Sequence, residues 1–284
     1  MIGLEASQNQ FIEKFEAWLR DYLNDCAANL NRSDILLASQ QYSLLSGGKR
    51  FRPFLASLVY SLFSDETMRL RNFCLGLEMI HTYSLIHDDL PCMDNDDFRR
   101  GKPTNHKVYS EDVALLAGDG LLTDVFVLLA ADPALAAEAR VNVIQMLACR
   151  IGSFGMVGGQ TLDMKVTAQI QLDDLKRIHT LKTANLIEAS ALGAGIYAGA
   201  DESVLTALQN FGHSLGMAFQ IKDDLLDVDD KAQDFKSYVG VLGLNETQKQ
   251  LEDYSEKARG HIKSLKKNSL LIEQLIDFNL TRSL

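Results

Sequence analysis

Proline is scarce in this chain and absent from its second half. The 284 residues include four prolines, and none of them lies between residues 134 and 284. Because proline removes a backbone donor and breaks helices, its absence over more than half of the chain favours long uninterrupted helices. Stretches of strand-like alternation are also missing, so the sequence predicts an all-α protein.

Several kinds of site and signal are missing as well. Neither of the glycine-rich patterns that bind dinucleotides or nucleoside triphosphates occurs. The four cysteines are scattered without a C-x-x-C pair, as is typical of reduced thiols in the cytoplasm. The longest nearly apolar run, residues 189–200, is too short to cross a bilayer, and no signal peptide is visible. We therefore expect a cytoplasmic protein without a membrane span.

Negative charge predominates. The 38 acidic residues outnumber the 28 lysines and arginines, which gives a formal net charge of -10. This balance argues against nucleic acid as a partner. If the carboxylates cluster, a metal cation is the more natural ligand.

Helical periodicity organises the chain. One helical face over residues 67–89 changes from apolar to polar along its length. Its members recur every three or four residues: Leu70, Phe73, Leu77, His81, Ser84 and Asp88. A polar loop follows at 91–106. Further helical patterns cover residues 5–30, 110–131, 134–157, 171–199, 201–229, 245–267 and 270–279. We expect a single domain over residues 1–284, built from about ten helices.

Two acidic motifs are the strongest chemical signal. The first contains Asp88, Asp89 and Asp94, and the second contains Asp223, Asp224 and Asp227. Such carboxylates repel one another, and apolar residues flank both motifs, so a solvated helix face explains them poorly. Hard oxygen ligands of this kind suit Mg²⁺, which commonly bridges to phosphate.

Basic residues are concentrated close to the first motif. Residues 47–53 pack three cations beside two glycines, and Arg99 and Arg100 follow the first motif closely. Arginine binds phosphate oxygens bidentately, so a diphosphate clamp is one interpretation. The alternative is that Arg99 and Arg100 only pair with the acids at 94–97.

Three further signals are weaker. Lys182 lies in an otherwise apolar helix, where a lone lysine is often a surface residue. Gln220 shares a helical face with the second motif. Gly158 and Gly159 indicate either close packing or ligand approach, or else a plain helix junction.

Together these segments resemble the trans-isoprenyl diphosphate synthases, most closely the bacterial farnesyl diphosphate synthases. The matching segments are GGKRFRP at 47–53, residues 80–104, GGQ at 158–160, LKT at 181–183 and FQIKDDLLD at 219–227. The resemblance implies a helical bundle around a deep central cavity, usually as a homodimer.

The resemblance also implies roles for individual residues. Isopentenyl diphosphate would be bound by Lys49, Arg52, His81 and Arg100. An allylic diphosphate would be held by Arg99 and Lys182, while Thr183 and Gln220 would line the reacting centre. All eight therefore count as substrate-binding residues. The residues expected to be catalytic are Asp88, Asp89, Lys182, Thr183, Gln220 and Asp223.

The implied cofactor is Mg²⁺, with about three ions per site and Mn²⁺ able to substitute. Its expected ligands are Asp88, Asp89, Asp94, Asp223, Asp224 and Asp227. Departure of the diphosphate would form an allylic carbocation that isopentenyl diphosphate attacks. Tyr83 and Ser84, shortly before the first motif, would limit the product to farnesyl diphosphate.

The chain departs from the family pattern in several places. A Gly-Lys pair expected after Asp227 is missing, and either Lys231 or Lys236 is left to replace it. Ala184 stands where glycine is usual, Lys222 stands where glutamine is common, and the C-terminal tail matches poorly.

Two alternatives to a prenyl synthase remain open at this point. The shortened segment after the second motif is compatible with a non-catalytic or regulatory prenyl synthase subunit. The dipeptide His87-Asp88, with His81, His106 and Asp224 elsewhere, is compatible with a helical metal-dependent phosphohydrolase.

Overall fold

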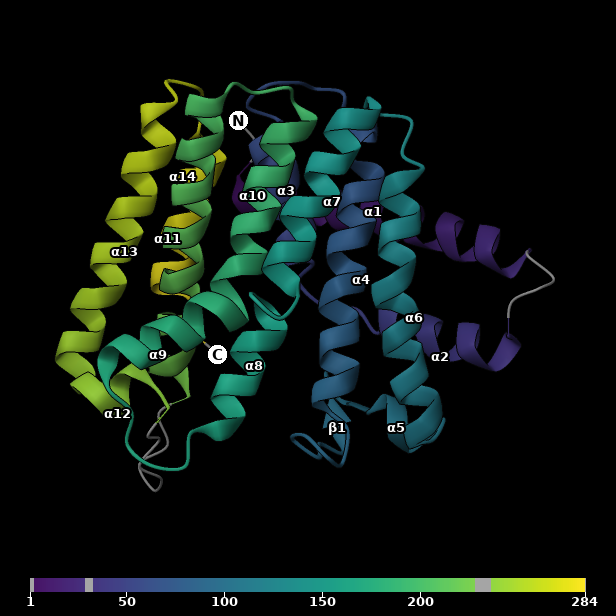
Figure 1. Ribbon diagram of the computed structural model, residues 1–284. Coiled ribbons are helices and arrows are strands. Elements are labelled where there is room, and N and C mark those ends of the chain that lie inside the picture. The colour runs from purple at the N-terminus through teal and green to yellow at the C-terminus, as the bar shows by residue number, and fades with distance from the viewer. Residues whose placement is uncertain (1–2, 29–32, 228–235, 284) are drawn as a thin grey trace. The chain divides into compact units, whose positions relative to one another are not determined.

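The computed structural model describes residues 3–28, 33–227 and 236–283, and helices dominate it (Figure 1). The predicted all-α class is confirmed. The chain divides into two compact units, one of residues 1–54 and 68–140 and the other of residues 55–67 and 141–284. The single domain over residues 1–284 stays a prediction.

The first unit contains the N-terminal helices and a small hairpin. Its elements are α1 (Leu4–Ala27), α2 (Asp34–Leu44), the start of α3 (Phe51–Tyr60), most of the 3-10 turn η1 (Thr67–Leu70), α4 (Arg71–Asp88), β1 (Phe98–Arg99), β2 (Lys102–Pro103), α5 (Asn105–Val108) and α6 (Glu111–Ala130). Helix α4 packs along α6 and also contacts α1 and α2. The long helix predicted over 67–89 is thus η1 followed by α4.

Aromatic residues fill the core of the first unit. Phe11, Phe15 and Trp18 lie on the buried face of α1, and the rings of Phe11 and Phe54 are 5.6 Å apart. Along α4, the predicted stripe is buried at Phe73 and becomes half-buried near its C-terminal end. Burial therefore fixes the helix at one end and leaves its polar end accessible.

The polar loop at 91–106 contains structure that the sequence did not predict. Strands β1 and β2 pair antiparallel, with Phe98 opposite Pro103 and Arg99 opposite Lys102. The two residues between them, Arg100 and Gly101, both have positive φ angles, of 53° and 74°. Such a turn matches the twist of a tight hairpin and fixes where the two arginines point.

The second unit consists of helices stacked around α11. Its elements are the rest of α3, most of α7 (Ala137–Ile151), α8 (Met156–Lys165), α9 (Leu172–His179), the π-helical turn η2 (Thr180–Ala184), α10 (Asn185–Tyr197), α11 (Glu202–Leu226), α12 (Tyr238–Leu242), α13 (Leu244–Ser264) and α14 (Leu270–Thr281). Helix α11 packs against α10 and α13, beside which it runs in Figure 1. Met217, Ala218 and Ile221 of α11 are fully buried in this core, together with Leu251 of α13.

Two helix predictions in the second unit need correction. The helix predicted over 171–199 is interrupted by the π-helical turn at Thr180–Ala184. The break expected at Gly158 and Gly159 lies earlier, around residues 152–155, so both glycines are inside α8. Gly159 marks close packing against η2 instead.

Two stretches have the length and apolar composition of a membrane span. They are α6 and the stretch Ala137–Lys165, and 33% of each apolar window is buried. The sequence prediction, based on one apolar run, did not anticipate them. Core helices of soluble proteins share these properties, so length and composition are weak evidence for a span.

Candidate active site

The first acidic motif lies at the C-terminal end of α4. Asp88 is the last residue of the helix and Asp89 is its C-cap. The backbone N–H of Asp94 donates to the Asp88 carbonyl at 2.8 Å, which returns the chain to the helix end. A helix C-terminus carries partial negative charge and disfavours anions. Three acids at this helix end therefore need nearby cations to neutralise their charge.

Arg99 supplies one such cation. Its Nε lies 2.7 and 3.0 Å from the two carboxylate oxygens of Asp89, and its Nη2 lies 2.5 Å from Oδ1. Burial nevertheless raises the pKa of Asp89, although Arg99 opposes that shift. Arg99 was expected to hold a diphosphate, and in the structure it neutralises Asp89.

Arg100 turns away from the acids and toward the glycine-rich segment. Its guanidinium donates to the Gly47 carbonyl and lies against Gly48. Burial lowers the pKa of Arg100; the charge of Glu78 opposes that shift, and the positive charges of Arg50 and Arg99 add to it. An anionic ligand would offset the repulsion from the two neighbouring arginines.

His81 lies within the same positive field. Burial holds its pKa well below the usual value, and Arg52 and Arg100 are the next largest causes. The structure thus brings three of the four residues predicted to bind isopentenyl diphosphate into one electrostatic neighbourhood. The fourth, Lys49, is exposed, and its carbonyl accepts from Gln8 Nε2 at 3.0 Å.

Arg50 has a different place from the cations beside it in the sequence. Its Nη1 lies 2.6 Å from Glu78, its Nη2 lies 2.6 Å from Glu16, and the side chain is fully buried. It also donates to the Leu44 carbonyl at 2.7 Å. Arg50 therefore forms structural ion pairs that fix the glycine-rich segment.

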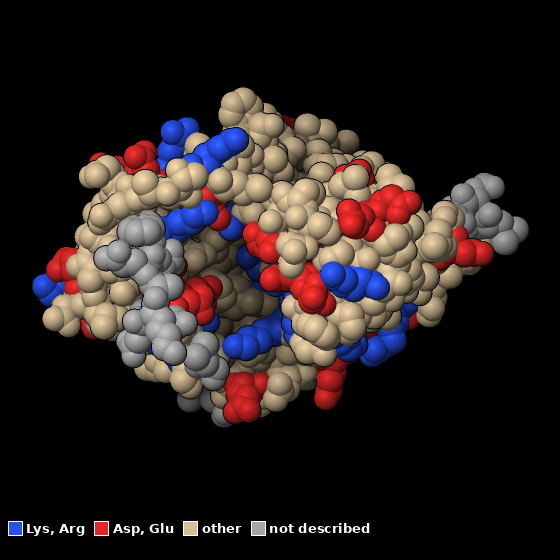
Figure 2. Space-filling view, turned by 90° about the horizontal axis from the view of Figure 1, so that it is seen from below, with Lys and Arg blue, Asp and Glu red and all other residues tan. Residues whose placement is uncertain are grey.

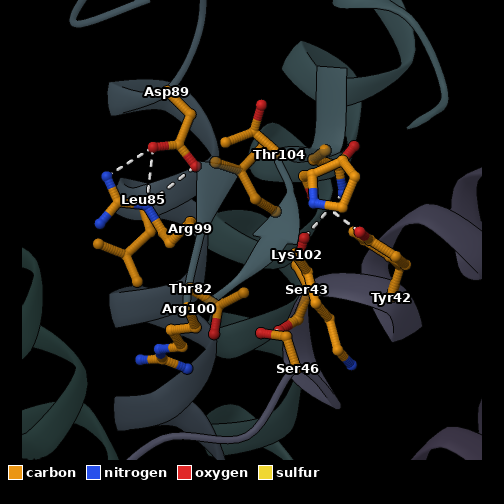
Figure 3. A pocket seen from close by; sticks show the side chains of 13 residues that line it. Tyr42, Ser43, Ser46, Thr82, Leu85, Asp89, Arg99, Arg100, Lys102 and Thr104 are labelled. Atoms are coloured by element: carbon orange, nitrogen blue, oxygen red, sulfur yellow. Dashed lines mark hydrogen bonds and ion pairs between the residues drawn. The ribbon is translucent and has the colours of Figure 1, made fainter. Parts of the chain in front are cut away.

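A small cavity lies beside the end of α4 and is lined by α2 and the hairpin. Figure 3 shows Arg99 directed at Asp89, whereas Arg100 extends away from it. Tyr42 Oη donates to the Pro103 carbonyl at 2.7 Å and ties α2 to the hairpin. Figure 2 looks onto this end of the molecule, where acidic and basic side chains gather.

Tyr83 and Ser84 lie one turn or more before the first motif. Tyr83 is buried, and its hydroxyl has no hydrogen-bond partner among the described residues. Burial raises the pKa of Tyr83 to about 12, and the charge of Asp88 contributes. Ser84 is half-buried and donates to the His81 carbonyl at 2.9 Å.

His87 gives no support to the phosphohydrolase alternative. Its Nε2 lies 3.0 Å from the Leu115 carbonyl of α6, and Gly118 leaves room for the ring. The imidazole is thus held against α6.

The second acidic motif also lies at a helix C-terminus. Asp223 and Asp224 are in the last turn of α11, and Asp227 is its C-cap. Asp223 is half-buried and pairs with Arg282, whose guanidinium stacks over Phe219 at 4.5 Å. As in α4, the helix dipole opposes the acids and favours bound cations.

The π-helical turn η2 carries Lys182 and Thr183. A Cβ added to Gly159 would lie 2.4 Å from the Lys182 backbone nitrogen, and one added to Gly216 would lie 2.6 Å from Ala184 Cα. Helices α8 and α11 therefore pack closely against the turn from both sides, because each has a glycine at the point of contact. Such turns widen the helix and are frequent at functional sites.

Lys182 and Lys236 converge on one acid of α8. Lys182 Nζ lies 2.6 Å from Asp163 Oδ2, and Lys236 Nζ donates to the Asp163 carbonyl at 2.9 Å. Lys182 is thus not a lone surface lysine. Of the two candidates for the missing Gly-Lys pair, Lys236 reaches this group, and Lys231 lies outside the described residues.

Thr183 and Gln220 meet as expected for neighbours in one centre. Thr183 Oγ1 donates to Gln220 Oε1 at 2.7 Å. Ala184, where glycine is usual, is fully buried against Gly216, and its small side chain fits there. Lys222 is half-buried, and burial lowers its pKa with help from the charge of Arg282.

Comparison with known proteins identifies the family. A family model described as polyprenyl synthetase matches residues 33–240, a range that contains both acidic motifs. The chain belongs to this family.

Curated relatives and solved structures extend this match over nearly the whole chain. Farnesyl diphosphate synthase of Bacillus subtilis (strain 168) is 37% identical over 94% of this chain and 95% of that protein. The Micrococcus luteus protein of the same name is 41% identical over 85% and 87% of the two chains. The crystal structure of a geranyltransferase from Legionella pneumophila is 30% identical, has a TM-score of 0.89, and covers 99% of this chain and 98% of its own.

These findings establish the chain as a trans-prenyltransferase enzyme of isoprenoid biosynthesis. They confirm the resemblance drawn from the motifs at 47–53, 80–104 and 219–227. They do not assign roles to individual residues.

The acidic motifs have the donor chemistry for magnesium. In residues 3–28, 33–227 and 236–283, no three acidic, histidine or cysteine side chains converge as a ready-made metal site. The predicted ligands are nevertheless all carboxylates, which suit Mg²⁺. Arg282 forms an ion pair with Asp223, at the position where a metal cation is expected. The residues therefore fit Mg²⁺, and the ion would have to gather its ligands.

The sequence analysis did not predict contacts between residues that are far apart in the chain. Arg282 contacts Asp223 across 59 positions, and Asp163 contacts Lys236 across 73. Periodicity carries no signal for such pairs. The one available hint was that Arg282 is the only cation in the poorly matching tail.

Proposed function

We propose that this enzyme condenses isopentenyl diphosphate head to tail with dimethylallyl or geranyl diphosphate and makes farnesyl diphosphate. The carrying observation is that both aspartate motifs lie at helix C-termini, where each requires cations. Membership in the polyprenyl synthetase family supports the reaction class.

The basic residues are proposed to bind the two diphosphates. Arg99 and Lys182, now paired with Asp89 and Asp163, would hold the allylic diphosphate. Isopentenyl diphosphate would be bound by Lys49, Arg52, His81 and Arg100. The neutral state of His81 suits a hydrogen-bonding role, and the arginine charges around it favour an anion.

The proposed magnesium ligands are Asp88, Asp89, Asp94, Asp223 and Asp227. About three ions are expected, and Mn²⁺ is expected to substitute. When bound, the metal supplies positive charge that stabilises the leaving diphosphate. Asp224, the sixth acid of the sequence prediction, already accepts hydrogen bonds from two protein donors and is not included.

The reaction requires the protein to supply positive charge, to orient the two substrates and to exclude water. The bond between the allylic carbon and diphosphate oxygen breaks, and the electron pair leaves with the diphosphate. The double bond of isopentenyl diphosphate attacks the allylic cation, and the departing diphosphate takes the proton that is lost. Arg99 and Lys182 stabilise the departing charge, and Thr183 and Gln220, already bonded to each other, line the centre.

Product length is proposed to end at farnesyl diphosphate because Tyr83 and Ser84 lie before the first motif. The buried ring of Tyr83 is a rigid obstacle on α4. Relatives named farnesyl diphosphate synthase match most of the chain, and others, such as that of Catharanthus roseus, are named geranylgeranyl pyrophosphate synthase. The first group covers more of both chains and supports the shorter product.

We further propose a cytoplasmic homodimer. Leu115, Leu116 and Val127 of α6 are 47%, 56% and 65% exposed, and a second copy would cover these apolar side chains. Four unpaired cysteines are compatible with a reducing compartment.

The deciding experiment incubates the purified protein with Mg²⁺, isopentenyl diphosphate and either dimethylallyl or geranyl diphosphate, and then sizes the prenyl products. We expect farnesyl diphosphate from both. Asp88→Ala and Asp223→Ala should each lower kcat by about 10²–10³-fold without unfolding the protein. Asp253→Ala, which removes an exposed acid of α13, serves as the control.

Two outcomes would contradict the proposal. No elongation by the protein alone would favour a regulatory subunit, and hydrolysis of a phosphoester with Mn²⁺ but no elongation would favour a phosphohydrolase. If the two aspartate motifs serve the same step, the losses in the double variant will be less than additive.

A further inference from the structure

Asp224 has surroundings unlike those of the neighbouring acids. It is 8% exposed, and both of its carboxylate oxygens accept hydrogen bonds. Oδ1 accepts from Gln220 Nε2 at 3.0 Å, and Oδ2 accepts from the backbone N–H of Tyr238 at 2.7 Å. The His179 ring closes the same side, with Nδ1 4.0 Å from Oδ2. The carboxylate is therefore engaged within the second unit.

The bond to Tyr238 fixes the start of α12. Tyr238 is the first residue of that helix, and the first N–H groups of a helix lack partners within it. Asp224 supplies the missing acceptor, while Ser237 accepts from Gly240 N–H at 3.1 Å. Lys236 lies two residues before Tyr238. By fixing the backbone at Tyr238, Asp224 therefore also positions the backbone from which the Lys236 side chain extends.

The other oxygen of Asp224 leads to the π-helical turn. Gln220 donates to Asp224 through Nε2 and accepts from Thr183 through Oε1. One amide thus connects the acid with the hydroxyl proposed to line the reacting centre. The orientation of Gln220 is set by its donation to Asp224.

Asp163 completes a closed ring of contacts. It binds Lys182, which is adjacent to Thr183, and it binds Lys236, which is two residues before Tyr238. The ring therefore passes through α8, η2, α11 and the start of α12. Asp163 therefore holds the ammonium groups of both lysines at one point of α8.

We propose that Asp224 is a positioning residue that holds Thr183 at the reacting centre and Lys236 beside Lys182, and is not a magnesium ligand. This inference rests on the proposed function. Asp89 differs, because its partner Arg99 has a side chain that can swing to a substrate. The N–H of Tyr238 is part of the backbone and cannot leave Asp224 without disturbing α12.

Asparagine at position 224 separates the two roles. In Asp224→Asn the new amide oxygen accepts from Tyr238, and its NH₂ donates to Gln220 Oε1. Rotation of the Gln220 amide then lets Nε2 donate to Thr183, whose hydroxyl also accepts. The ring survives while the charge needed by a metal is lost. Asp224→Ala removes the ring, and Asp223→Asn is the matched loss of charge.

We expect distinct kinetic and binding results. Asp224→Asn should keep the allylic KM within about threefold of the wild-type value, whereas Asp224→Ala raises it about tenfold or more. In titrations of Mn²⁺ with inorganic pyrophosphate, Asp224→Asn should bind nearly as wild type, and Asp223→Asn about tenfold or more weakly. If Asp224→Asn weakens Mn²⁺ binding as much as Asp223→Asn, Asp224 is a ligand and the inference is overturned.

A paired exchange tests the hydrogen-bond direction. Gln220→Glu places a second carboxylate against Asp224 and should raise the allylic KM. Adding Asp224→Asn supplies a donor to the new carboxylate and should recover most of that loss. Failure of the second substitution to improve the first would contradict the ring.

Hydrogen exchange tests the inference without any turnover. In the protein free of metal and substrate, amides of residues 236–243 should exchange faster in Asp224→Ala than in the wild type, and not in Asp224→Asn. Equal exchange in Asp224→Ala and the wild type would overturn the inference. By contrast, unchanged Mn²⁺ binding in Asp223→Asn would contradict the proposed function and leave the ring intact.

Discussion

His81 shows how one residue is tuned by its neighbours. It lies on the face of α4 that changes from buried to accessible, and the nearby arginines oppose a second positive charge. The side chain is therefore neutral at physiological pH. A neutral imidazole can donate or accept a hydrogen bond to a diphosphate without repelling the arginines beside it.

The lowered pKa of His81 predicts a pH dependence of stability. The unfolded chain protonates this residue near pH 6.5, whereas the folded protein does so only at a lower pH. Between the two values the unfolded state binds more protons, so falling pH destabilises the fold by at most about 1.4 kcal/mol per pH unit. Urea unfolding at pH 7.5 and 5.0 should show a smaller difference for His81→Gln than for the wild type. Equal differences would contradict the prediction.

Tyr83 predicts the length of the product. Tyr83→Ala removes the ring from α4 and should give products longer than farnesyl diphosphate, at a cost in stability of about 3–5 kcal/mol. Tyr83→Phe is the matched control, because the hydroxyl has no described partner and the ring volume is kept. Product sizing by chromatography checks both variants. An unchanged product from a folded Tyr83→Ala enzyme would place the limit elsewhere.

Individual residues could be proposed from the sequence as site candidates where their chemistry was concentrated in motifs, and their roles stay predictions. The aspartates of both motifs, Lys182, Thr183 and Gln220 fall in this class. Tyr238 was not predicted, because its contribution is a backbone N–H that any residue type carries. Arg282 was missed because its partner Asp223 lies 59 positions away.

At the scale of elements, the π-helical turn η2 depends on two glycines. Gly159 of α8 and Gly216 of α11 leave no room for a methyl group beside Thr180–Ala184. The close approach of the two helices keeps Lys182 next to Asp163. The turn is thus maintained by packing from neighbouring helices, since wide turns have poor internal stability.

Gly159→Ala should therefore destabilise the protein. The added Cβ would lie 2.4 Å from the Lys182 nitrogen, and backbone must move, at a cost of about 1–3 kcal/mol. The control is Gly260→Ala in α13, where nothing lies within 4 Å and alanine should stabilise by about 0.5–1 kcal/mol. Urea denaturation checks both changes. Equal effects of the two substitutions would show that η2 does not depend on close packing.

Most helices follow from periodicity, and the exceptions have local causes. The pattern over 171–199 is continuous in the sequence, yet packing against α8 and α11 imposes a π-helical turn. The hairpin after α4 rests on a two-residue turn, too short to show alternation. Both exceptions carry candidate site residues, where local preference commonly yields to function.

At the scale of the whole molecule, the exposed apolar side chains of α6 predict dimerisation. Leu116→Glu would place a charge among Leu115 and Val127, and should convert a dimer into a monomer in light scattering after gel filtration. Met68→Glu, at another exposed apolar residue, should leave the dimer unchanged. A monomeric wild-type protein, or a dimeric Leu116→Glu variant, would contradict the proposal.

The all-α class could be predicted because it depends on global properties, namely proline distribution and helical period. The family could be predicted because its motifs at 47–53 and 219–227 are rare combinations. The contacts that organise the second unit could not, since they join residues far apart through ordinary hydrogen bonds. Sequence pattern thus predicted the fold class and the family, whereas the contacts that hold the second unit together required the structure.

The aspartates at the ends of α4 and α11 have a practical consequence for engineering. Asp88 and Asp227 lie where the helix dipole disfavours an anion, so replacing either with a neutral or basic residue should raise the melting temperature of the apoprotein. A thermostability screen run in chelator would therefore reward the loss of these acids and select inactive variants. Screening with magnesium and inorganic pyrophosphate present would reverse that bias.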